Sequence, residues 1–146
     1  MEPITLGIIV RKSSLRGEIQ SLLSQMSVRV VLESADVENW TETILQIERA
    51  QPDVILLDVS AVGDSLSDVV RRIRGTAVSP LVVAMHVTSD TQIILDAMRS
   101  GASEFLFPPF DTTLQAAVQR LAAERSQSKN PHQINGKVLG FLSVKG

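Results

Sequence analysis

Residues 52–58 read Pro52-Asp-Val-Ile-Leu-Leu-Asp58 and are the most continuously apolar strand candidate of the chain. Its four consecutive apolar residues lack the alternation of apolar and polar residues that is typical of a strand with one solvent-exposed face. A short continuous apolar run between turn-forming residues is typical of a strand buried on both faces of a parallel sheet. The run therefore predicts a central strand that ends at Asp58.

The same pattern recurs on both sides of this segment, because strand-like runs alternate with helical stripes of apolar residues. Strands are expected over residues 5–10, 28–32, 53–58, 80–85 and 104–107, with 28–32 nearer an edge. Five such strand–helix units with short connections predict right-handed crossovers and a parallel sheet. The predicted fold class is α/β, a flavodoxin-like (βα)5 doubly wound sheet with strand order 2-1-3-4-5. The helices between and after the strands carry their apolar stripes from Leu15 to Met26, Val37 to Ile47, Leu66 to Ile73, Ile93 to Met98 and Leu114 to Leu121.

Several helix ends carry capping residues. Gly101 follows the fourth stripe and is expected to take the left-handed conformation that ends a helix. Ser13 and Ser14 either cap the first helix or hold an anion at its N-terminus. The remaining start signals are the possible capping boxes Ser65 with Asp68 and Ser89 with Gln92, and Asp111 before the last helix.

Composition excludes several functions. The 146 residues include 14 Lys and Arg against 16 Asp and Glu, so the net charge of −2 argues against nucleic-acid binding. The chain has no cysteine, and His86 and His132 are too far apart for a ligand pair, so we expect no metal site. No apolar stretch reaches the roughly 18 residues of a membrane helix, so we expect a cytoplasmic chain without membrane insertion. Trp40 is expected in the core, and Arg71, Arg72 and Arg74 on a solvated face.

The chain divides into three parts. Residues 1–125 carry the alternating pattern and form the predicted domain. Residues 126–135 are polar and are expected to be a linker. Residues 136–146 look like the first strand of a further, truncated domain, so 146 residues correspond to one domain and a fragment.

Residues 52–58 and the stretch Ala97-Met-Arg-Ser-Gly-Ala-Ser-Glu-Phe-Leu-Phe-Pro-Pro-Phe-Asp111 together resemble the receiver (CheY-like) domain of response regulators. The resemblance covers residues 4 to about 125, and the phospho-acceptor of that family maps onto Asp58. Receivers hold Mg²⁺ with two acidic residues after the first strand, where this chain has Arg11 and Lys12. Met85 replaces the hydroxyl residue that ends the fourth strand, and Pro108 replaces the phosphate-binding lysine.

These replacements oppose ordinary phosphotransfer, because Mg²⁺ needs hard oxygen ligands and two cations repel it. Asp58 then has two interpretations. It is a strand-end carboxylate paired with Arg11 or Lys12, with a modest effect on stability. Alternatively, the pair locks the domain in one receiver-like state, with a cation in place of the metal.

Residues 136–146 resemble the first strand of a MinD/ParA-type ATPase, with Lys145 and Gly146 as the start of its nucleotide-binding loop. A degenerate receiver before such an ATPase resembles the TadZ/CpaE family of Tad (Flp) pilus assembly. The resemblance implies a regulatory, localising or dimerising module with no cofactor of its own, ATP and Mg belonging to the next domain. It also implies that this chain is not an enzyme.

The same resemblance implies a homodimer, with residues 89–125 as the candidate surface, pilus-assembly proteins as partners and a polar position in the cell. Two alternatives remain open at this stage. One is a phospho-accepting receiver that uses Asp58 in a two-component relay. The other is a flavodoxin-like domain that binds a small ligand.

Overall fold

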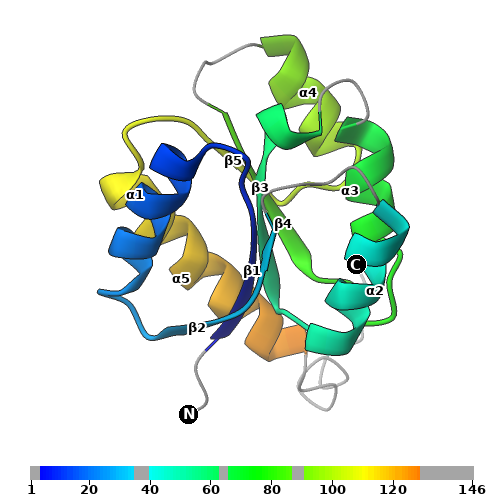
Figure 1. The fold of residues 1–146 in the computed structure, drawn as a ribbon, viewed down its shortest axis with the longest axis horizontal. Coiled ribbons are helices and arrows are strands. Elements are labelled where there is room, and N and C mark those ends of the chain that lie inside the picture. Colours follow the sequence, from blue (N-terminus) through cyan, green and yellow to red (C-terminus); the bar gives the residue numbers. More distant parts are fainter. Residues whose placement is uncertain (1–3, 35–39, 63–65, 87–90, 129–146) are drawn as a thin grey trace, which may run out of the picture.

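The computed structural model describes residues 4–34, 40–62, 66–86 and 91–128. They form a five-stranded parallel sheet in the order β2-β1-β3-β4-β5, with helices on both faces (Figure 1). The predicted fold class and strand order are confirmed. In chain order the elements are β1 (Ile4–Ile9), α1 (Ser13–Leu23), β2 (Val28–Ser34), α2 (Trp40–Ala50), β3 (Val54–Asp58), the 3-10 turn η1 (Val59–Ala61), α3 (Leu66–Arg74), β4 (Leu81–Met85), α4 (Thr91–Arg99), β5 (Glu104–Leu106) and α5 (Phe110–Ser128).

The central strands β3 and β4 are buried along their whole length, as the continuous apolar runs indicate. Their register pairs Val54 with Leu81 and Asp58 with Met85. Because all five strands are parallel, their carboxyl ends share one edge of the sheet. This edge carries Asp58.

The sheet separates two apolar cores. In Figure 1, α1 and α5 cover one face, and α2, α3 and α4 cover the other. Ile8 and Leu56 belong to the first core, and Ile55 and Leu57 belong to the second. Each fully buried aliphatic or aromatic side chain contributes about 1.5–3 kcal/mol through its removal from water. The two cores therefore hold the carboxyl edge of the sheet in place.

Gly7 allows β1 to pack tightly between its neighbours. A Cβ at this position would lie 2.6 Å from Ile55 Cδ1 and 3.3 Å from a methyl carbon of Leu32. Here the register with β2 also shifts, because Leu6 pairs with Val30 and Gly7 pairs with Leu32. An irregularity of this kind bends an edge strand and disfavours pairing with another chain.

The helix ends confirm one prediction and correct two. Gly101 has a φ of 115° and follows α4, as expected of a helix-ending glycine. The residue before α1 is Lys12, which makes no side-chain cap, so Ser13 and Ser14 do not cap the helix. Helix α5 begins at Phe110, and Asp111 lies in its first turn and accepts a hydrogen bond from the Thr112 N–H. Val37, expected in the apolar stripe of the second helix, and Ser65 and Ser89, expected to cap the third and fourth helices, lie outside the described residues.

Other differences come from packing. Met98 is 43% exposed instead of joining the α4 stripe, and Ala97 is the buried residue of that helix. Trp40 is half-buried against the core beneath α2, α3 and α4. Helix α5 continues to Ser128, into the segment expected to be a linker, because exposed polar residues do not by themselves end a helix. Within the described ranges, no helix combines the length and apolar character needed to cross a membrane.

Candidate functional site

The carboxyl edge of the sheet brings together some of the predicted site residues. Arg11 and Lys12 follow β1 and are exposed, and Met85 is fully buried at the end of β4 beside Asp58 in the register. Pro108 is exposed and lies beyond the end of β5. Among these predicted site residues Asp58 is the carboxylate, and Arg11 and Lys12 lie on the loop that follows β1.

Asp58 is enclosed by hydrogen-bond donors. The residue is buried, with 2% of its surface exposed to solvent. The Ser60 hydroxyl oxygen lies 2.8 Å from each carboxylate oxygen, and the Ser60 N–H donates to Oδ1 at 3.0 Å. The Arg11 N–H donates to Oδ2 at 3.3 Å. Donors from two loops thus meet on this one carboxylate.

These partners differ from the predicted ones. Within the part of the chain that the structure describes, neither Arg11 nor Lys12 forms an ion pair with Asp58. The backbone of Arg11 approaches the carboxylate, while both cationic side chains remain exposed and keep their hydration. Sequence reasoning missed Ser60. Its signal is a hydroxyl residue two positions after an aspartate, a spacing at which side-chain and backbone hydrogen bonds form a local turn.

The edge does not fit the Mg²⁺ ion that receivers use. Mg²⁺ requires oxygen ligands in near-octahedral geometry, usually with carboxylates among them. Among the predicted site residues Asp58 is the carboxylate, and its oxygens already accept hydrogen bonds, while Arg11 and Lys12 stand where the resemblance to receivers would place acidic residues. Among the described residues, no group of three or more His, Cys, Asp or Glu could hold a metal ion.

His86 directly follows β4 at the same edge. Its backbone N–H donates to the Leu106 carbonyl at 3.0 Å, and the Nδ1 atom of its imidazole ring is buried without a hydrogen-bond partner. The second histidine, His132, and the predicted nucleotide-binding residues Lys145 and Gly146 lie outside the described residues.

A second polar cluster lies at the opposite edge of the sheet, where β3 begins, and the sequence did not indicate it. Arg125 of α5 places Nε 3.6 Å from Asp53 Oδ1 and donates to the carbonyls of Ser79, at 3.0 Å, and Val78. Asp53 also accepts hydrogen bonds from the Thr5 N–H and hydroxyl, at 3.0 and 3.1 Å. This cluster joins α5 to the amino-terminal ends of β1 and β3.

Arg74 belongs to the same region and corrects a prediction. It is half-buried, and its Nη1 lies 3.1 Å from each of the carbonyl oxygens of Ser79 and Pro80. Arg71 and Arg72 are exposed, as expected. The arginine run of α3 is therefore only partly a solvated face.

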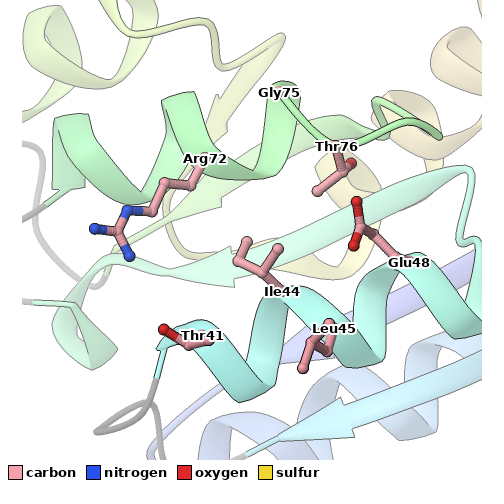
Figure 2. A pocket seen from close by; sticks show the side chains of 7 residues that line it. All are labelled: Thr41, Ile44, Leu45, Glu48, Arg72, Gly75 and Thr76. Atoms are coloured by element: carbon pink, nitrogen blue, oxygen red, sulfur yellow. The ribbon is translucent and has the colours of Figure 1, made fainter.

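A groove of about 380 Å³ lies between α2 and α3. Figure 2 shows Ile44 and Leu45 along its α2 side, with Arg72 toward one end and Glu48 toward the other. It lies on a helical face of the sheet and not at the edge that carries Asp58. Its lining residues are Thr41, Ile44, Leu45, Glu48, Arg72, Gly75 and Thr76.

The candidate dimer surface, residues 89–125, exposes large apolar side chains. Leu95 and Met98 of α4 are 41% and 43% exposed, and Phe107 after β5 is 43% exposed. Arg120 of α5 pairs with Glu104 of β5 at 2.9 Å. The hydrogen bond and charge of Glu104 raise the pKa of Arg120 above its usual value, so its guanidinium stays charged across the working range of pH.

Comparisons with known proteins agree with this fold. No protein-family profile matches the chain. The chain is 24% identical over 104 residues to the chemotaxis protein CheY of Listeria monocytogenes, covering 70% of this chain and 85% of CheY. Its structure superposes on the signal receiver domain of the response regulator NarL from Mycobacterium tuberculosis with a TM-score of 0.71 and 23% identity, covering 84% and 98% of the two chains.

A further similar structure is that of a protein described as pilus assembly-related, from Burkholderia pseudomallei. It matches with a TM-score of 0.70 and 19% identity, covering 82% of this chain and 90% of the other. At this identity the match establishes a shared fold.

Proposed function

Since the described residues form a domain of the receiver (CheY-like) type, we propose that it works as a pseudo-receiver, independently of phosphorylation. Its role is that of a regulatory, localising or dimerising module in a Tad (Flp) pilus-assembly protein. In this role the domain presents a fixed surface and transfers no phosphoryl group.

The environment of Asp58 carries this proposal. Asp58 is 2% exposed, and its carboxylate accepts hydrogen bonds from Ser60 and Arg11. Phosphorylation would add negative charge beside it, and that charge requires a metal ion or cations placed to receive it. Two cations stand where receivers hold the metal, and Met85 and Pro108 offer no side-chain donor to a phosphoryl group.

The link to pilus assembly has two supports. Residues 136–146 resemble the start of a MinD/ParA-type ATPase domain, and the domain order resembles TadZ/CpaE proteins. The similar fold of the Burkholderia pseudomallei protein is consistent with this assignment. A glycine-rich run ending in Lys-Thr, encoded directly after Gly146, is the expected continuation.

Incubation with acetyl phosphate and Mg²⁺ tests the central claim. We expect no gain of about 80 Da on Asp58 by mass spectrometry, while a CheY protein treated in parallel is modified. A phosphorylated Asp58 in the native chain would instead establish the alternative, a phospho-accepting receiver of a two-component relay. The position of Asp58 at the carboxyl end of β3 is the observation that favours this alternative.

A structural role for Asp58 can be tested separately. The carboxylate connects the loop after β1 with η1, so Asp58→Ala removes one acceptor from both loops. If this connection fixes the state in which the domain assembles, D58A changes the oligomeric state measured by analytical ultracentrifugation. Unchanged assembly would eliminate the locked-state hypothesis and leave Asp58 as an ordinary strand-end carboxylate.

A further inference from the structure

We propose that Ser60 is a positioning residue whose hydroxyl hydrogen-bonds the Asp58 carboxylate and keeps its oxygens from reacting. The hydroxyl, and not a cation, thus closes the acceptor position. This inference rests on the proposed pseudo-receiver function and deepens it, because it names the group that controls the site. Its experiment does not use phosphoryl transfer, so the two proposals can fail independently.

The geometry singles out Ser60 among the donors around Asp58. Its hydroxyl oxygen lies 2.8 Å from both Oδ1 and Oδ2, so the hydroxyl bridges the two oxygens. Its N–H donates to Oδ1 as well. Hydrogen bonds to a charged group are roughly twice as strong as hydrogen bonds between neutral groups. Ser60 therefore restrains the carboxylate through both its side chain and its backbone.

Closure by Ser60 has a chemical consequence. To act as a nucleophile, a carboxylate oxygen needs an exposed lone pair aligned with the electrophile. The Ser60 hydroxyl directs its hydrogen bond at the two oxygens, and the Arg11 N–H occupies a further site on Oδ2. An incoming electrophile has to displace the hydroxyl before either oxygen can attack.

The cationic side chains do not perform this role. Arg11 and Lys12 are exposed, and neither of them lies within ion-pair distance of Asp58 in the described part of the chain. Arg11 acts through its backbone N–H, which any residue other than proline could provide. Replacement of the two cationic side chains alone leaves the hydroxyl bridge intact.

Carbodiimide labelling measures this closure without a metal or a phosphodonor. The folded chain is treated with a water-soluble carbodiimide and glycinamide: a reachable carboxyl adds to the carbodiimide, and the amine of glycinamide then forms the amide while the carboxyl oxygen leaves in the urea. Tryptic cleavage after Arg49 and Arg71 gives one peptide, residues 50–71, that contains Asp53, Asp58, Asp64 and Asp68. Tandem mass spectrometry then gives the rate at each position.

We expect Ser60→Ala to raise the labelling rate of Asp58 at least about ten-fold over that of the native chain, the lower end of the range for one lost hydrogen bond to a charged group. Ser60→Thr keeps the hydroxyl and should label at the native rate. Asp68, whose side chain is 70% exposed, serves as the reference for reagent activity. Asp53 is buried at the other end of β3 and reports general loosening of the fold.

An S60A rate at Asp58 equal to the native rate would overturn the proposal. So would equal acceleration at Asp53 and Asp58, or an S60T rate as high as that of S60A. If S60A fails to fold, Ser60→Cys takes its place, because a thiol is similar in size and only a weak donor. Faster carbodiimide labelling in S60A, together with phosphorylation of the native Asp58 by acetyl phosphate, would refute the proposed function and retain the role of Ser60.

Discussion

At the scale of single residues, Arg125 shows how a buried cation is accommodated. Its side chain is 17% exposed, and that of its partner Asp53 is 10% exposed. Burial of both charges is costly unless each is paired and hydrogen-bonded. The carbonyls of Val78 and Ser79 and the Thr5 hydroxyl supply the additional hydrogen bonds.

Arg125→Met should therefore lower the free energy of unfolding by about 2–4 kcal/mol, because it leaves a buried carboxylate without its cation. Urea denaturation measures the change. Arg71→Met is the matched control, since the ion pair of Arg71 with Asp68 spans 3.6 Å between side chains that are 66% and 70% exposed. The control should change stability by less than about 0.5 kcal/mol. Equal effects of the two substitutions would show that Arg125 contributes no more than a surface charge.

The sequence predicted the position of Asp58 in the fold, but it did not predict which residues contact Asp58. The apolar run and its closing aspartate put Asp58 at the end of a central strand, because local periodicity determines strand ends. The hydrogen bond to Arg11 joins residues 47 positions apart, and the contacts of Arg125 span 46 and 47 positions. Such long-range contacts depend on the packed fold, so the predicted cation pair was wrong and Arg125 was missed. Ser60 lies only two positions from Asp58, but its hydrogen bonds depend on the turn that the chain makes directly after β3.

At the scale of elements, two glycines should respond in opposite directions to the same change. Gly7→Ala in β1 should lower stability by about 1–3 kcal/mol, because its Cβ would lie 2.6 Å from Ile55 Cδ1. Gly17 lies inside α1 with nothing within 4 Å of an added Cβ. Gly17→Ala should raise stability by about 0.5–1 kcal/mol, because alanine has the higher helix propensity.

Thermal and urea unfolding of both variants test this pair. A stabilised Gly7→Ala variant would mean that β1 and its neighbours move apart at little cost. A destabilised Gly17→Ala variant would mean that the exposed face of α1 contacts another part of the protein.

Helix α4 shows where periodicity misleads at this scale. The apolar stripe through Ile93, Ile94, Ala97 and Met98 is wider than the face that the sheet covers. Ala97 is buried, Ile93 and Ile94 are half-buried, and Met98 is exposed. Periodicity identifies the helix, but the position of the neighbouring elements decides which edge of the stripe remains in water.

At the scale of the whole molecule, the exposed edge of α4 provides a test of the proposed dimer. Met98→Glu places a charge within the candidate surface, residues 89–125. We expect the native chain to sediment as a dimer and the variant to dissociate at least about ten-fold more readily, because a buried unpaired charge is costly. Leu45→Glu on α2 is the matched control, since Leu45 is 46% exposed and lies outside that surface.

Analytical ultracentrifugation over a range of concentrations measures both variants. A native chain that sediments as a monomer throughout would refute the dimer. An equal loss of association in L45E would show that the assembly uses the face formed by α2 instead.

Strand β3 also affects how the chain can fold as it is synthesised. Asp53 immediately precedes the strand and Asp58 ends it, and they bind residues 48 and 47 positions earlier in the chain. Asp53 also pairs with Arg125, which lies near the end of the last helix. At synthesis rates of about 5–20 residues per second, β1 is synthesised roughly 6–24 s before Arg125. During this interval the face of β1 that shares a core with α5 lacks that helix, so a nascent chain of this fold is most exposed to aggregation before its last helix is complete.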